Sequence, residues 1–237
     1  MAVPFFGPPE AAGNLNGNAN ATPFDPAPPG RFQQVYDSSI FGSLAQSGGG
    51  YIAEISFRID AFQGHSFMAT IPSIQINLST TTLFPDGLSS VFSQNVGSDD
   101  MMVFGPSAAS LTGVGGGGVT GFHVSFSFST PFFYDPANGN LLLDIRIHEG
   151  FGPIGPPQGV AILDAFSVAG DSVSSVYAFG PTSPTSGQVS TLGLATAFHV
   201  VPVPEPSLIA LLAVGVGMLG VGWKRMRKHK EGKNAAD

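Results

Sequence analysis

The sequence predicts a mainly β protein, an antiparallel β-sandwich of the jelly-roll-like kind followed by a single C-terminal transmembrane helix. Apolar and polar residues alternate with a period of two in several stretches between residues 31 and 201, as in strands that bury one face. Clusters of Gly, Pro, Asp and Asn separate these stretches, and no amphipathic helical pattern occurs before Ser207. About nine such strands suit a sandwich, with a barrel as the alternative.

The alternation is clearest in four stretches, which cover residues 53–60, 74–79, 122–129 and 141–148. In each, apolar residues occupy every second position, so we expect one buried face and one solvent-facing face. The residues assigned to the buried face are Ala53, Ile55, Phe57, Ile59, Ile74, Ile76, Leu78, Phe122, Val124, Phe126, Phe128, Leu141, Leu143, Ile145 and Ile147. Further strands are expected over residues 32–36, 101–104, 160–166, 173–179 and 189–200, with turns at 85–87, 135–140, 150–159 and 180–187.

Residues 1–30 precede this pattern and are expected to form a flexible leader. Six prolines lie between residues 7 and 30, and asparagines occupy alternate positions from 14 to 20, a composition typical of segments without a packed core. The β-sandwich domain then covers residues 31–201, which is long enough for a sizeable core. Residues 202–237 form a separate C-terminal segment.

The composition limits what this domain can bind. The chain has no cysteine, which excludes disulfides, thiolate metal sites and a cysteine nucleophile. Residues 1–223 contain three arginines, no lysine and fourteen acidic residues, a net charge of −11. An acidic domain lacks the cationic surface that binds phosphate, so no nucleic-acid partner is expected.

The C-terminal segment predicts a membrane-spanning helix over residues 207–223. These residues carry no charge, and at about 1.5 Å per residue they would form a helix of about 26 Å, at the short end of what a bilayer core requires. A buried core helix is the alternative, but such a helix rarely ends in a run of cations. The residues expected to anchor the chain in membrane lipid are Leu208, Leu211, Leu212, Val214, Val216, Leu219 and Trp223.

A basic tail, residues 224–237, follows the predicted span and sets its orientation. It carries six basic and two acidic residues, a net charge of +4, so the positive-inside rule places it in the cytoplasm and residues 1–206 outside. Residues 1–30 lack the pattern of a signal peptide, although this topology requires export, and we therefore expect the true start codon to lie upstream. The basic stop consists of Lys224, Arg225, Arg227 and Lys228.

Pro204, Glu205 and Pro206 come directly before the predicted span. This triplet, the short span and the basic end together resemble the PEP-CTERM sorting signal of bacterial surface proteins. The resemblance implies recognition by an exosortase, a membrane-embedded transpeptidase, and processing near the triplet. A stiff linker is the alternative for Pro-Glu-Pro, and a GPI signal normally lacks the basic end.

Parts of the β domain also resemble an uncharacterised module that is frequent in PEP-CTERM proteins. The matching stretches are residues 31–36, 74–80, 134–136 and 139–144. This resemblance implies an extracytoplasmic location and a sandwich-like fold, and it implies no activity.

Calcium is the one metal that the sequence suggests. Asp135, Asn138 and Asn140 offer oxygen ligands in one turn, and Asp99 and Asp100 offer adjacent carboxylates in another; hard cations prefer such ligands. The alternative is a tight hairpin connection in which Asp135 caps its own backbone. No other cofactor is expected.

Two classes of function fit the sequence. We expect a non-enzymatic protein of the bacterial surface or extracellular matrix, structural or associated with exopolysaccharide, and the alternative is a surface hydrolase of such polymers. A glycosidase needs two carboxylates beside a cleft, and of the candidates Glu54, Asp60, Asp144 and Glu149, the first three fall on solvent-facing positions. Sugar stacking would depend on the tyrosines, because the single tryptophan is in the predicted span; they are Tyr36, Tyr51, Tyr134 and Tyr177.

Overall fold

The structure is a computed structural model, and it describes residues 3–13, 15–24, 30–115, 117–119, 121–150, 161–180 and 184–203. The chain divides into two compact units, Met1–Pro202 and Val203–Asp237. All described residues except Val203 belong to the first unit. The predicted span, the basic tail and the Pro-Glu-Pro triplet lie outside the described residues.

Antiparallel sheets make up the first unit, which confirms the prediction of a mainly β fold. The first sheet has four strands, in the order β1 (Val3–Gly7), β13 (Thr196–Pro202), β4 (Gly50–Arg58) and β7 (Phe122–Tyr134). The second has six, in the order β11 (Gln188–Ser190), β10 (Val173–Phe179), β3 (Gly30–Tyr36), β8 (Asn140–Glu149), β5 (Phe67–Thr81) and β6 (Met101–Gly113). The third has the order β12 (Leu192–Leu194), β9 (Leu163–Ser167) and β2 (Asn18–Asn20).

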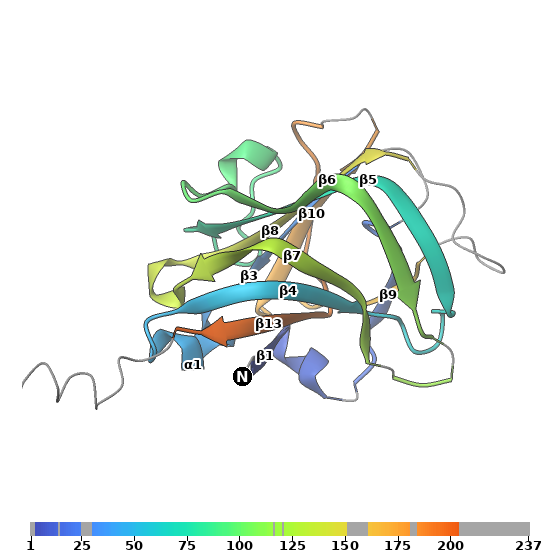
Figure 1. The fold of residues 1–237 in the computed structure, drawn as a ribbon, viewed down its shortest axis with the longest axis horizontal. Helices are drawn as coiled ribbons and strands as arrows, with labels where there is room; N and C mark the ends of the chain where they lie inside the picture. Colours follow the sequence, from blue (N-terminus) through green and yellow to red (C-terminus); the bar gives the residue numbers. More distant parts are fainter. Residues whose placement is uncertain are drawn as a thin grey trace, which may run out of the picture. The chain divides into compact units, whose positions relative to one another are not determined.

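The described helices are short, and all of them lie in connections between strands. They are η1 (Pro9–Ala12), η2 (Ser38–Phe41), α1 (Gly42–Ala45), η3 (Phe92–Gln94) and η4 (Pro136–Asn138). None of the helices in the described part of the chain is long and apolar enough to cross a membrane. Figure 1 shows how the strands surround a common interior, with β5 and β6 forming a long curved hairpin at one side.

One hydrophobic core lies between the four-stranded and six-stranded sheets. Inward-facing residues of β4 and β7, such as Ile55, Phe57 and Phe126, belong to the same cluster as Ile76 and Ile145 of β5 and β8. The alternation therefore assigned these residues correctly, because every second side chain of a strand points to the same side. It was wrong for Ala53 and Phe122, which lie beside register shifts in the pairing of β4 with β7 and are only partly buried outside the core. The stretch expected as one strand over residues 189–200 is divided instead into β11, β12 and β13.

The expectation of a flexible leader is wrong for the described part of residues 1–30. β1 pairs with β13, from Val3 opposite Val200 to Gly7 opposite Thr196, and β2 pairs with β9. Phe24 is fully buried in the main core. Strand pairing and burial over a long sequence separation stabilise this segment, and its local composition does not reveal them.

Arg58 binds the segment after β1 to the body of the domain. Its guanidinium donates to the Asp164 carboxylate (Nε to Oδ2, 2.7 Å) and to the carbonyl oxygens of Ala11, Gly13 and Leu15 (3.0, 3.1 and 2.6 Å). Both charged side chains are almost completely buried. Position 58 was expected on a solvent-facing side, and the N-terminal segment is what covers it.

The outer face of the six-stranded sheet is also partly covered. Leu88 and Phe92, from the connection between β5 and β6, pack on Val35, Leu142 and Val176 of the sheet in a second apolar cluster. This cover removes from solvent a sheet face that the alternation had marked as exposed. Leu142 is buried for this reason.

The same cover explains why Asp144 is only 2% exposed, against the expectation for its position. Asp144 accepts hydrogen bonds from Arg31, Arg146 and Gln33. Burial raises the pKa of Asp144, but the hydrogen bonds and charges of the two arginines outweigh this effect and hold the pKa below its ordinary value.

Candidate binding cleft

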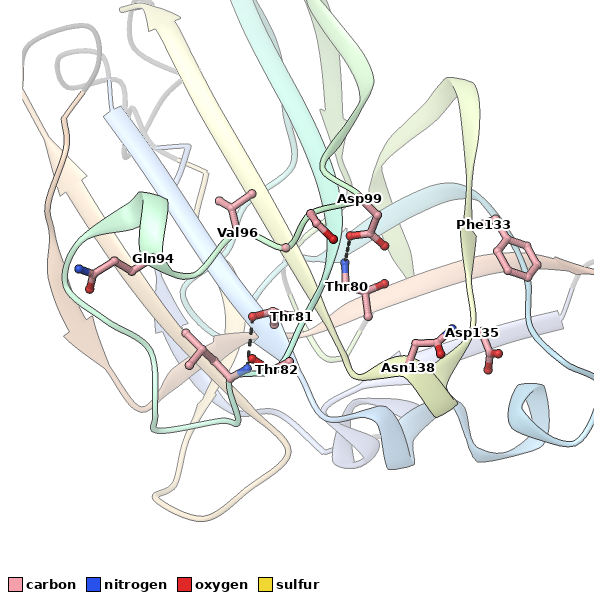
Figure 2. A pocket seen from close by; sticks show the side chains of 12 residues that line it. Thr80, Thr81, Thr82, Gln94, Val96, Asp99, Phe133, Asp135 and Asn138 are labelled. Carbon is pink, nitrogen blue, oxygen red and sulfur yellow. Dashed lines mark hydrogen bonds between the residues drawn. The ribbon is translucent and has the colours of Figure 1, made fainter.

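A cleft of about 480 Å³ opens where the connection between β5 and β6 faces the end of β7. The last residues of β5 separate two walls, one formed by the segment that ends at Asp99 and the other by the segment that begins at Phe133 (Figure 2). Hydroxyl, amide and carboxylate groups predominate among its side chains. The lining residues are 80–83, 94, 96–99, 133, 135 and 138.

Two glycines allow the walls to approach β5 closely. A Cβ at Gly97 would overlap the carbonyl oxygen of Thr80, and a Cβ at Gly139 would lie 2.6 Å from the carbonyl oxygen of Thr81. Gly139 also has a φ of +142°, which side chains other than hydrogen strongly disfavour. Larger residues at these positions would therefore displace the walls.

Each wall carries one aspartate that is held by a local hydrogen bond. Asp99 accepts through Oδ1 from the backbone N–H of Thr80 (2.7 Å), and Asp135 accepts through Oδ1 from the N–H of Ala137 (3.0 Å), capping η4. Within the described residues, the Oδ2 atoms of both aspartates have no hydrogen-bond partner. Backbone N–H groups, one at the end of β5 and one in η4, thus fix both carboxylates and leave an acceptor on each.

An exposed aromatic pair adjoins the cleft. Tyr51 of β4 lies opposite Phe133 of β7, with 5.3 Å between the ring centroids, and the side chains are 45% and 43% exposed. Phe133 also lines the cleft, so the rings and the polar walls form one continuous surface. Val201 of β13 lies on the other side of Tyr51 and is also exposed.

Only part of the tyrosine set proposed for sugar stacking is accessible. Tyr36 and Tyr134 are fully buried, and burial raises the pKa of each hydroxyl. Tyr177 is partly buried and contacts Phe179 at a centroid distance of 5.9 Å. Tyr51 is therefore the only one of the four that lies beside the cleft.

A polar row follows the aromatic pair along the outer face of the four-stranded sheet. Glu54 accepts from the hydroxyl of Ser127 (2.8 Å), and its other oxygen lies 3.5 Å from Nε2 of His199. The carboxylate lies between the hydroxyl and the imidazole, so Ser127 donates to Glu54 and not to His199. This order differs from a nucleophile–base–acid arrangement, in which the imidazole binds the hydroxyl.

The carboxylates considered for glycosidase chemistry do not converge on the cleft. Asp60 is 2% exposed, against its expected solvent-facing position, because it accepts hydrogen bonds from Asn16, Phe62 and Gln63 and closes the turn after β4. Asp144 is engaged by its arginines, as described above. The cleft itself contains Asp99 and Asp135 instead.

The predicted calcium ligands are only partly brought together. Asp135 and Asn138 line the cleft, but Asn140 is buried, with its oxygen accepting from the N–H of Ser38 (2.8 Å) and its nitrogen donating to the carbonyl oxygen of Leu83 (2.9 Å). In the described ranges, no three His, Asp or Glu side chains cluster as a metal site. The Asp135 cap matches the hairpin alternative, and calcium binding stays a prediction.

Sequence analysis did not identify Phe133 or the threonines at the end of β5 as site residues. The signal for Phe133 is the pair Phe132-Phe133, which breaks the alternation of β7 by placing a large apolar ring on the outer face. The placement of Asp99 and Asp135 in one cleft could not be detected locally, because it depends on the strand pairing of β5 with β6 and β8.

Comparison with known proteins identifies the C-terminal segment. A family model described as the PEP-CTERM protein-sorting motif matches residues 202–228. No curated protein and no solved structure matches the chain. The chain therefore carries a PEP-CTERM sorting motif, as the Pro-Glu-Pro triplet suggested, and the motif implies an exported protein that is recognised by an exosortase.

Proposed function

We propose that this protein is a non-enzymatic component of the bacterial surface or extracellular matrix, and that its β-sandwich, jelly-roll-like domain associates with extracellular polysaccharide. The cleft with its exposed aromatic rim is the observation that carries this proposal. Two antiparallel sheets around one core support the sandwich assignment.

The surface of the cleft suits the chemistry of a sugar. A pyranose ring has apolar C–H faces and a periphery of hydroxyls, and it therefore needs flat apolar contacts beside hydrogen-bonding groups. Tyr51 and Phe133 supply rigid aromatic area. Thr80, Asp99 and Asn138 supply donors and acceptors on the walls. A concave site with a few fixed polar groups is the usual form of a small-ligand site.

Delivery to the surface depends on the C-terminal segment. Residues 207–223 would cross the membrane once and contact its lipid, with the basic tail inside and the β domain outside. Processing near Pro204, Glu205 and Pro206 would then transfer the domain to the cell surface or the matrix. Alanine at these three positions should leave an unprocessed membrane form in a bacterium that has an exosortase. A wild-type protein that keeps its mass through Asp237 in such cells would contradict this route.

The alternative function, a surface hydrolase, would use Asp99 and Asp135, because they are the carboxylates on the two walls. Retaining and inverting glycosidases both flank the bond with such a pair. Release of reducing ends from a bound polymer, abolished by Asp99→Asn, would favour the hydrolase. Binding without release favours the non-enzymatic function.

The binding experiment uses the full chain in detergent micelles and immobilised neutral and amino-sugar oligosaccharides. Tyr51→Ala and Phe133→Ala should each weaken binding about tenfold, because a stacking contact contributes about 0.5–1.5 kcal/mol beyond its buried area. Tyr177→Ala is the matched control, since Tyr177 belongs to an aromatic pair on the other sheet. Equal losses in all three variants, or no binding by the wild type, would refute the site.

A further inference from the structure

Among the described residues, the cleft carries negative charge without a compensating cation. Asp99 and Asp135 line it, and no Lys, Arg or His is among its lining residues. A third carboxylate, that of Asp37, acts on the same region. Burial raises the pKa of the Tyr134 hydroxyl, and the negative charges of Asp37 and Asp135 raise this pKa further. A ligand in the cleft therefore meets a negative potential.

The arginines of the domain cannot reverse this potential. Residues 1–223 contain only Arg31, Arg58 and Arg146 and no lysine. Arg31 and Arg146 are paired with Asp144, and Arg58 is paired with Asp164. An anionic polymer, such as one rich in uronate, would find no unpaired arginine or lysine beside the aromatic rim among the described residues.

The free oxygens of the two aspartates match an ammonium group. Each aspartate uses Oδ1 to accept from a backbone N–H, that of Thr80 at the end of β5 for Asp99 and that of Ala137 in the same turn for Asp135, and Oδ2 remains as an acceptor among the described residues. An ammonium has three donors and no acceptor, and hydrogen bonds between ionised groups are roughly twice as strong as neutral ones. The faces of Tyr51 and Phe133 also attract cations.

We propose that the cleft selects polysaccharides with free, positively charged amino groups, and that Asp99 and Asp135 bind these amines while Tyr51 and Phe133 stack on the sugar rings. This inference deepens the proposed association with polysaccharide and rests on it. It specifies the class of polymer, a partly or fully deacetylated hexosamine chain.

The test compares three oligosaccharides of equal length with the full chain in detergent micelles. The probes are a β-1,4-linked glucosamine hexamer, its fully N-acetylated counterpart and a hexamer of galacturonate. Because a hydrogen bond to a charged group contributes about 1.5–3 kcal/mol, the glucosamine hexamer should bind about tenfold or more tightly than the acetylated one. Added salt should weaken this preference.

The variants Asp99→Asn and Asp135→Asn keep a side-chain oxygen that can accept the backbone hydrogen bond and remove the charge. Each should reduce affinity for the glucosamine hexamer toward that of the acetylated hexamer and leave the acetylated affinity unchanged. Glu149→Gln is the control, because it removes the same charge from an exposed residue at the far end of β8. Unchanged melting temperatures confirm that the variants fold.

The outcomes separate this inference from the function on which it rests. Equal binding of the amino and acetylated hexamers, or tighter binding of galacturonate, overturns the amine selectivity and leaves the polysaccharide association intact. The same loss in Glu149→Gln as in Asp99→Asn shows a general charge effect and also overturns it. No binding of any hexamer overturns both.

Discussion

Replacing Arg58 with methionine removes the charge that binds the N-terminal segment while keeping much of the side-chain volume. The variant leaves the carbonyl oxygens of Ala11, Gly13 and Leu15 without their guanidinium donors. It also leaves the buried Asp164 carboxylate with the N–H of Gly17 (2.7 Å) as its remaining hydrogen-bond donor among the described residues. The guanidinium is thus the centre of a buried polar network.

The size of the effect follows from that burial. Removing one partner of a buried ion pair costs about 3–5 kcal/mol, because the other charge stays buried without compensation. Small domains have total stabilities of about 5–15 kcal/mol, so at least about a fifth of the stability should be lost. Burial raises the pKa of Asp164 even beside Arg58, as expected where removal from water disfavours the charged form.

Urea unfolding of the full chain in mild detergent measures the loss of stability as a lower midpoint urea concentration, with the dependence of unfolding free energy on urea unchanged. Adding Asp164→Asn to the variant should recover part of it, because the uncompensated charge is gone. Arg146→Met is the control: its side chain is 30% exposed and Asp144 keeps Arg31, so about 1 kcal/mol or less is expected. Lowering the pH should reduce the difference in unfolding free energy between Arg58→Met and the wild type, because protonation neutralises Asp164. A loss below about 1 kcal/mol in Arg58→Met, or one equal to that of the control, would refute this account.

Three further predictions concern the core, acid stability and calcium. Phe126→Ala should lower the free energy of unfolding in urea by about 3–5 kcal/mol, because Phe126 is 2% exposed and contacts the rings of Phe24, Phe57 and Phe104. The side chain of Ser127 points outward, so Ser127→Ala should lower it by about 1 kcal/mol or less. Equal losses in the two variants would show that the register is wrong. The pKa of Asp144 is lowered in the folded state, so the ionised carboxylate stabilises the fold above the ordinary aspartate pKa, and this stabilisation is lost as the pH falls toward the folded pKa. The difference in unfolding free energy between wild type and Asp144→Asn should therefore shrink on acidification. A difference that stays constant with pH would contradict the pKa assignment. If Asp135 and Asn138 hold calcium, a hundredfold excess over Kd should raise stability by about 2.7 kcal/mol, whereas a melting temperature that is the same in calcium and in chelator would support the hairpin alternative.

Local pattern was sufficient to predict the inner faces of the sheets. Ile55 and Phe57 lie in the core as their alternation indicates, because a strand reverses its side chains at each residue. The same rule failed at Arg58 and Asp144 on the outer faces, which other segments cover. Whether an outer face is covered depends on contacts between residues far apart in the chain, and no local period encodes them.

The cleft shows the same limit. Asp99 and Asp135 were each recognised as polar turn residues, but as separate features. They line one cleft because β5 pairs with β6 on one side and β8 on the other, which brings together the connections that flank those strands. The C-terminal motif, by contrast, was fully predictable, because its identity lies in the order of residues within one short segment.

The position of β13 makes completion of the four-stranded sheet depend on the C-terminal end of the domain. β13 pairs with β1 on one side and β4 on the other and ends at Pro202, directly before the sorting triplet. The four-stranded sheet therefore closes only when the chain around Val200 pairs with the chain around Val3 on one side and with β4 on the other. Contacts of such long sequence separation form slowly, so the pairing of β1 with β13 should be a late step in folding of the domain.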